Sequence, residues 1–171
     1  VDTLFPGVGG PEVEAQREAV LRARDKRLFV LTGGPGTGKT TTVLRMLLRL
    51  AKDRVDRGQT DPVIRMSAPT GKAAQRLSEA LRTGAAQLRG GEWEMFLDRV
   101  MSAESGTLHR LLGSRGQGHF NHHAGTPVAA DIVVVDEASM ADLTLLRLLL
   151  DALRDDAVLI LVGDADQLTS V

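Results

Sequence analysis

Short apolar runs alternate along the chain with longer segments in which apolar residues recur every three or four positions. The apolar runs predict buried strands at residues 28–32, 63–68, 132–135 and 158–162. The third run is continuously β-branched, which is typical of a parallel strand that is covered on both faces. The segments with helical periodicity predict helices at residues 39–53, 70–82 and 142–153, with Thr70 as a plausible N-cap of the second.

The order of these elements predicts the fold class. Strand and helix alternate, which predicts an α/β fold with a mostly parallel sheet and helices on both faces. Residues 84–127 interrupt the alternation, because they are Gly-rich and irregular, with short helical pieces expected near 93–101 and 108–112. The 171 residues fit one domain with a sizeable core, and we find no internal repeat.

The polar positions of the first predicted helix lie together. Arg45, Arg49 and Lys52 follow one another at helical spacing, opposite its apolar residues. We expect these three side chains to form a solvated face of the helix.

Composition narrows the kinds of partner that the chain can bind. Its net charge is −1 and its pI is about 6.5, so any contact with DNA must come from a local basic patch. Aromatic residues make up 3%, so platforms for base stacking are scarce, with Trp93, Phe96 and Phe120 as the candidates. The chain has no Cys and no apolar run of membrane-spanning length. We expect a cytoplasmic protein without a membrane partner.

Residues 33–40, GGPGTGKT, match the phosphate-binding pattern G-x-x-x-x-G-K-[ST] between a predicted strand and a predicted helix. The glycines let backbone N–H groups point at phosphate oxygens, and the positive end of the helix faces the same place. The Lys39 ammonium would neutralise phosphate oxygens, and the Thr40 hydroxyl would ligate Mg²⁺. The expected nucleotide-binding residues are Gly33, Gly34, Pro35, Gly36, Thr37, Gly38, Lys39, Thr40 and Thr41.

Two carboxylates end the β-branched strand. Asp136 would hold Mg²⁺ at the carboxyl end of the strand, where parallel sheets bind ligands. Glu137 is the expected general base for the attacking water. Gln167, beyond the last predicted strand, could orient a water or sense a γ-phosphate. The polar segment that ends at Gln167 is weak evidence by itself, because Asp-rich turns are common.

Other polar positions have both a functional and a structural interpretation. Gln16 could pair with both the donor and the acceptor of adenine, or could be an exposed helical residue. The segment Thr70, Gly71 and Lys72 could bind a DNA phosphate at a helix N-terminus, or Thr70 could be only an N-cap. Thr107 and His109 allow the same two interpretations. We expect no metal at His109, His119, His122 and His123, because no Cys or suitably spaced carboxylate accompanies them.

Several segments in the same order resemble the successive motifs of superfamily 1 helicases. They are GGPGTGKTTTV (33–43), APTGKAAQRL (68–77), TLHRLLG (107–113), DIVVVDEASMADL (131–143) and LVGDADQLTSV (161–171). TLHRLLG, HHAGTP (122–127) and DQLTSV resemble more specifically the RecD family, the alpha subunits of exonuclease V (RecBCD). The resemblance covers nearly the whole chain.

This resemblance implies a three-layer RecA-like fold in which the Gly163 strand lies between the strands of Leu31 and Val134. It implies that Gln167 lies at the γ-phosphate, that Gln16 reads adenine, and that Thr70, Thr107 and His109 touch single-stranded DNA. It also implies a 5′-to-3′ ATP-dependent motor of double-strand-break repair with RecB-like and RecC-like partners. A complete motor of this family has a second lobe with arginine fingers, so we expect residues 1–171 alone to be largely inactive.

Two other functions remain open from the residues. One is a different phosphate-loop NTPase that acts as a switch, although no guanine-reading N-K-x-D pattern is present. The other is a module that binds nucleotide only to organise a complex. The presence of both Lys39 and Glu137 favours an enzyme over such a module.

Overall fold

The computed structural model describes residues 2–5, 10–23, 26–34, 36–59, 61–116 and 118–164. Its helices are α1 (Pro11–Arg22), α2 (Lys39–Asp56), α3 (Gly71–Ala86), α4 (Glu94–Ser102), α5 (Leu108–Leu111) and α6 (Leu143–Ala152), with 3-10 turns η1 (Asp2–Leu4) and η3 (Ala138–Met140). Its strands are β1 (Leu28–Thr32), β2 (Ile64–Ala68), β3 (Glu104–Thr107), β4 (Ile132–Val135) and β5 (Val158–Gly163). None of these described helices is both long and apolar enough to cross a membrane.

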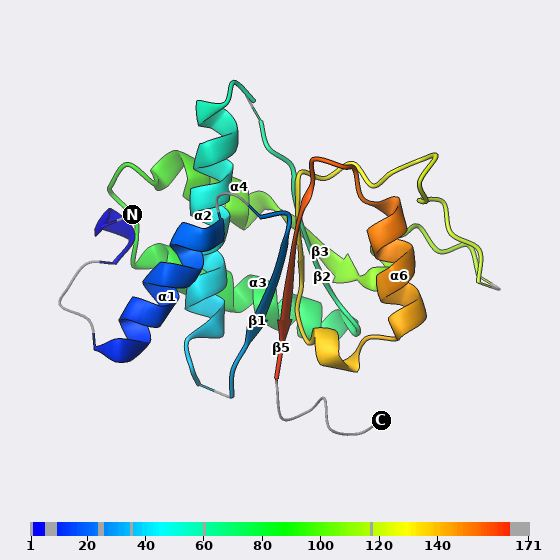
Figure 1. Cartoon of the computed structure of the whole chain (residues 1–171), viewed down its shortest axis with the longest axis horizontal. Helices are drawn as coiled ribbons and strands as arrows, with labels where there is room; N and C mark the ends of the chain where they lie inside the picture. Colours follow the sequence, from blue (N-terminus) through cyan, green and yellow to red (C-terminus); the bar gives the residue numbers. More distant parts are fainter. Residues whose placement is uncertain are drawn as a thin grey trace.

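The strands form one parallel sheet in the order β1-β5-β4-β2-β3. Strand β5 therefore lies between β1 and β4, as the resemblance to superfamily 1 helicases implied. Helices cover both faces, so the predicted α/β fold is confirmed. Figure 1 shows α1 to α4 on one side of the sheet and α6 on the other.

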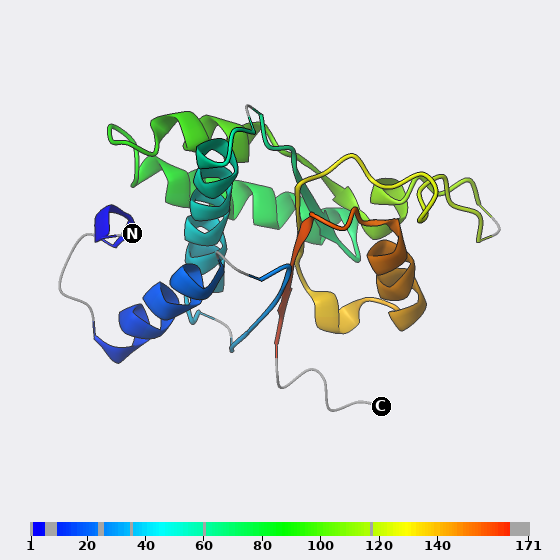
Figure 2. The same ribbon diagram turned by 45° about the horizontal axis from the view of Figure 1, so that its top comes forward.

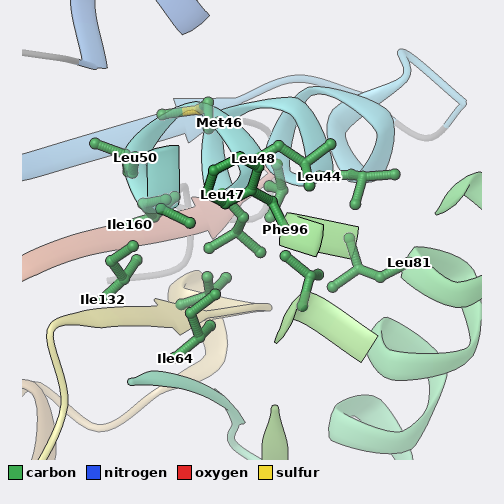
Figure 3. Packing of buried hydrophobic residues seen from close by; sticks show 14 of the residues in the cluster. Leu44, Met46, Leu47, Leu48, Leu50, Ile64, Leu81, Phe96, Ile132 and Ile160 are labelled. Atoms are coloured by element: carbon green, nitrogen blue, oxygen red, sulfur yellow. The ribbon is translucent and has the colours of Figure 1, made fainter. Parts of the chain in front are cut away.

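Alternate residues of the central strands belong to two separate hydrophobic cores, one on each face of the sheet. On one face Ile64, Ile132 and Ile160 pack against α2, α3 and α4, and Figure 3 shows Leu47 and Phe96 among them. On the other face Val133 and Val135 are fully buried with residues of α5 and α6. This two-sided burial explains the continuous apolar run of β4.

Strand β3 is an element that the hydrophobic pattern did not predict. Its sequence, ESGT, contains no apolar residue, and it forms an edge of the sheet. It pairs in parallel with β2, and the two strands are also joined by an ion pair of 3.1 Å between Arg65 and Glu104. The segment 84–127 is therefore partly a continuation of the sheet.

Side-chain caps mark the starts of α3 and α6, and the cap of α3 is the predicted residue Thr70. Thr70 caps α3, because its hydroxyl accepts a hydrogen bond of 3.2 Å from the Ala73 N–H. Asp142 caps α6 in the same way through the Thr144 N–H at 2.6 Å. Helix α2 runs to Asp56, one turn beyond the predicted end.

The described residues between Gly113 and Pro127 project from the body of the molecule (Figure 2). Backbone hydrogen bonds within the segment hold it in two small antiparallel bridges, Ser114 with Phe120 and His123 with Thr126. Its own backbone therefore defines its shape.

Candidate functional site

The carboxyl ends of all five strands lie along one edge of the sheet, since the strands are parallel. The predicted phosphate loop follows β1, the carboxylates Asp136 and Glu137 follow β4, and Asp164 follows β5. The other predicted contacts, Thr70 and Thr107, follow or end β2 and β3. The strand order thus places the predicted nucleotide contacts in one half of the edge and the predicted DNA contacts in the adjacent half.

The phosphate loop is folded around its own lysine. Lys39 Nζ donates hydrogen bonds to the carbonyls of Gly33 at 2.5 Å and of Gly34 at 2.7 Å. Gly36 and Gly38 have φ values of 76° and 72°, which favour glycine. Gly38 is a fixed glycine of the pattern, whereas Gly36 occupies one of its variable positions. Pro35 lies outside the described residues.

The predicted catalytic and metal-binding side chains that the structure describes share one cavity. Lys39, Thr40, Asp136 and Glu137 line a cavity of about 240 Å³, together with residues of β5 and η3. Lys39 is the only basic side chain among the described residues that line this cavity. A cation, a hydroxyl and two carboxylates around such a space fit a phosphate with a divalent cation.

Asp136 is held where it can meet a cation. Its Oδ1 accepts a hydrogen bond of 2.9 Å from the Glu137 N–H. Burial raises the pKa of Asp136, and the Glu137 N–H and the charge of Lys39 offset only part of that rise. A partly buried carboxylate of this kind gains stability when a metal ion neutralises it, so Asp136 and Thr40 fit a Mg²⁺ site.

Glu137 has a left-handed backbone, with φ 50° and ψ 37°. Among the described residues it is the only non-glycine with positive φ. Such a conformation costs on the order of 1–3 kcal/mol and persists where the surrounding structure enforces it. The turn into η3 keeps the side chain at the cavity, where Glu137 is a lining residue.

Gln16 lies on the other side of the phosphate loop. It lines a second cavity, of about 380 Å³, with Leu31, Gly33 and Lys39. Lys39 thus lines both cavities, and a nucleotide with phosphates at Lys39 could place its base beside Gln16. The exposed-helix alternative for Gln16 is wrong, because the residue is only part-exposed and contacts α2.

The predicted DNA contacts are brought together by the pairing of β2 with β3. Ala68 pairs with Thr107, so the N-terminus of α3 lies beside that of α5. The Thr107 hydroxyl caps α5 by accepting from the Arg110 N–H at 3.2 Å. Gly71, Lys72 and His109 are exposed at these two N-termini.

Some predictions from the sequence are corrected. Trp93 and Phe96 are 3% and 5% exposed, so they are core residues and cannot stack bases. Phe120 packs partly buried against α5 and lies 6.1 Å from the His109 ring, centroid to centroid. Arg45 and Arg49 do not belong to a solvated face, because the Arg45 guanidinium lies over Phe5 and the part-buried Arg49 pairs with Asp53. Gln167 lies outside the described residues.

Two polar residues of the site had not been predicted from the sequence. Ser139 lines the smaller cavity, and its buried hydroxyl has no hydrogen-bond partner among the described residues. The signal in the sequence that could have indicated Ser139 as a site residue was its position three residues after Asp136. Arg45 binds Gln16, and no local pattern could have indicated a contact between residues 29 apart in the chain.

Comparison with known proteins gives consistent matches. The AAA domain family matches residues 16–171. The RecBCD enzyme subunit RecD of Mycolicibacterium smegmatis is 47% identical over 164 residues, covering 95% of this chain and 29% of the relative. The corresponding subunit of Haemophilus influenzae is 39% identical over 158 residues, covering 91% and 24%.

A second kind of relative is the ATP-dependent RecD2 DNA helicase of Deinococcus radiodurans. It is 37% identical over 158 residues, which cover 92% of this chain and 18% of the relative. The chain therefore spans less than a third of the length of each of these relatives.

Proposed function

Since this chain belongs to the AAA domain family, which matches residues 16–171, we propose that it is the ATP-binding segment of a RecD-type DNA helicase. The observation that carries the proposal is the shared cavity of Lys39, Thr40, Asp136 and Glu137 at the carboxyl edge of the sheet. The similarity to RecD and RecD2 proteins over more than nine-tenths of the chain supports it.

The proposed chemistry assigns one task to each side chain. Lys39 leaves its loop carbonyls and binds the β- and γ-phosphates, while Thr40 and Asp136 would hold Mg²⁺. When bound, that ion neutralises charge on the transferring phosphoryl group. Glu137 accepts the proton of the attacking water. Gln167 senses the γ-phosphate in this proposal.

The neighbouring half of the sheet edge is the proposed DNA track. Thr70, Gly71 and Lys72 lie at the N-terminus of α3, which favours phosphate oxygens through backbone N–H groups and the helix dipole. Thr107 and His109 lie beside them, at the end of β3 and in α5. Contacts of this kind carry no sequence information, so binding should not depend on the DNA sequence. The similarity to RecD-type helicases supports single-stranded DNA as the ligand.

The intact protein would combine this segment with others. We propose that it moves 5′ to 3′ in double-strand-break repair, that RecB-like and RecC-like subunits are its partners, and that it works in the cytoplasm. Charge on the γ-phosphate exceeds what Lys39 neutralises, so an arginine from a second motor lobe is the expected complement. By itself this segment, a single lobe, would then bind nucleotide and hydrolyse it slowly.

Glu137→Gln tests the proposed chemistry in the intact protein. The amide keeps the shape of the side chain but cannot accept a proton, so kcat should fall about 10²- to 10⁴-fold. ATP affinity measured by calorimetry should stay near that of the unmodified protein. Hydrolysis at the original rate would assign the general base to another residue and remove the central step of the proposal.

A further inference from the structure

Arg45 is a part-buried cation between the N-terminal turn and α1. Its guanidinium carbon lies 4.3 Å from the centroid of the Phe5 ring, which is 6% exposed. Its Nη1 donates a hydrogen bond of 3.1 Å to Gln16 Oε1. Burial lowers the pKa of Arg45, and its buried Nε has no hydrogen-bond partner among the described residues.

These contacts determine which way the Gln16 amide points. A guanidinium has only donors, so the atom of Gln16 that faces Arg45 must be the carbonyl oxygen. The amino group then faces the phosphate loop. A β-carbon placed on Gly38 would lie 2.6 Å from Gln16 Nε2 but 4.0 Å from Oε1.

A fixed amide can distinguish purine bases, whereas a freely turning one distinguishes them less. Adenine presents a donor, its amino group, beside an acceptor ring nitrogen. Guanine presents the acceptor O6 beside the donor N1–H, which is the reverse order. An amide that could turn over would match either base, but an amide whose oxygen is held can match only one order.

We propose that Arg45 is a positioning residue that makes Gln16 selective for adenine over guanine nucleotides. This inference rests on the proposed ATP-binding function and adds the origin of its base selectivity. One lone pair of Gln16 Oε1 accepts from Arg45, and the second remains for the adenine amino group. The amino group of Gln16 then donates to the neighbouring ring nitrogen.

The low-polarity surroundings of Arg45 make this constraint effective. A hydrogen bond from a charged donor is about twice as strong as one between neutral groups, and Phe5 covers the guanidinium from one side. Arg49, one turn further along α2, pairs instead with Asp53 at 3.2 Å. Arg49 therefore offers a matched control, a part-buried arginine of the same helix with a different partner.

The test compares affinities of the intact protein for ATP, GTP and inorganic tripolyphosphate by calorimetry. Tripolyphosphate has no base, so its affinity measures binding by the phosphate loop alone. In Arg45→Met, the preference for ATP over GTP should fall about 3- to 10-fold, which is the usual effect of one hydrogen bond. Tripolyphosphate affinity should not change, and Arg49→Met should keep the original preference.

Two further variants separate the explanations. Arg45→Met should have no additional effect in a Gln16→Ala background, because Arg45 acts through Gln16. Arg45→Gln is the alternative if Arg45→Met does not fold. It offers both a donor and an acceptor, so the Gln16 amide can turn over, and the preference should fall while thermal stability is kept.

An unchanged preference in folded Arg45→Met and Arg45→Gln proteins, with the preference lost in Gln16→Ala, would overturn the role of Arg45. If Arg45→Met lost tripolyphosphate affinity to the same extent as ATP affinity, the proposal would also be overturned, since Arg45 would then act on the phosphate loop. If Gln16→Ala kept the preference, base reading by Gln16 would be wrong, and Arg45 would have no such role. Failure of the unmodified protein to bind ATP and tripolyphosphate would instead reject the proposed function itself.

Discussion

At the scale of residues, Lys39 lines both cavities beside the phosphate loop, so we expect nucleotide binding to depend on this side chain most. Lys39→Ala removes the cation that faces the phosphates, and affinity for Mg·ATP should fall about 10- to 100-fold, as for other charge-assisted hydrogen bonds. Calorimetry on the folded variant measures this. Lys52→Ala, which removes the part-exposed pair with Asp56 on the same helix, should bind normally. Equal affinities of the two variants would contradict the assignment.

The left-handed backbone of Glu137 predicts that the site trades stability for function. Glu137→Gly and Glu137→Ala both remove the carboxylate, but only glycine adopts φ 50° without strain. The glycine variant should be roughly 1 kcal/mol more stable than the alanine variant in urea unfolding. Both variants should hydrolyse ATP about 10²- to 10⁴-fold more slowly than the unmodified protein, as expected for Glu137→Gln. A more stable alanine variant would show that the conformation carries no strain.

The structure brings the predicted residues Lys39, Thr40, Asp136 and Glu137 to one cavity, but the sequence did not indicate the residues that pack behind the phosphate loop. Lys39, Asp136 and Glu137 belong to local patterns in which a loop or strand end fixes the geometry. Arg45 was predicted to be solvated. Helical spacing indicates on which side of α2 a residue lies, but it does not indicate which residues cover that side. Phe5 and Gln16 cover it, and such tertiary contacts leave no periodic signal in the sequence.

At the scale of elements, the N-terminus of α3 combines capping with a proposed DNA contact, and one substitution can separate them. Thr70→Asp keeps a good N-cap, so thermal stability should be retained. Its negative charge should repel DNA phosphates and weaken DNA binding of the intact protein at all sequences. Thr83→Asp, an exposed position near the end of the same helix, is the control. Similar DNA affinity for both variants would show that the N-terminus of α3 does not contact DNA.

Asp131 directly precedes β4 and connects several segments at the amino-terminal edge of the sheet, opposite the proposed site. Its carboxylate accepts from the Val63 N–H at 2.7 Å, binds Arg154, and lies 3.7 Å from Arg54. Burial alone would raise the pKa of Asp131, but these hydrogen bonds and the charge of Arg154 lower it overall. The carboxylate therefore stabilises the fold above its unfolded pKa, and this contribution is lost as the pH falls through the folded pKa.

Urea unfolding at two pH values tests this linkage. At pH 7, Asp131→Asn should cost about 1–3 kcal/mol, because a charge-assisted network is broken. Near pH 3 the difference from the unmodified protein should shrink. Asp61→Asn removes an exposed ion pair with Arg99 and should cost about 1 kcal/mol or less. A cost for Asp131→Asn that grows as the pH falls would show the opposite sign of the pKa shift.

The predicted elements were confirmed where burial makes the hydrophobic pattern distinct. The strand β4 and the helices α2, α3 and α6 have continuous or periodic apolar residues. Strand β3 does not, because an edge strand with the sequence ESGT is stabilised by backbone pairing with β2 rather than by side-chain burial. Local sequence cannot reveal pairing of that kind.

At the scale of the whole molecule, the strand order is what joins the two proposed activities. The proposed nucleotide contacts follow β1, β5 and β4, and the proposed DNA contacts follow β2 or lie at the end of β3. Strands β4 and β2 are direct neighbours, so Asp136 N–H donates to the Ser67 carbonyl of β2 at 2.8 Å. This hydrogen bond is a direct backbone link between the two halves of the edge.

The most direct test is the rate of ATP hydrolysis by the intact protein with and without single-stranded DNA. The shared edge predicts that DNA accelerates hydrolysis, that acceleration does not depend on DNA sequence, and that Thr70→Asp reduces it while leaving the DNA-free rate unchanged. A rate that is the same with and without DNA, in a protein that binds both ligands, would contradict the coupling of the two halves.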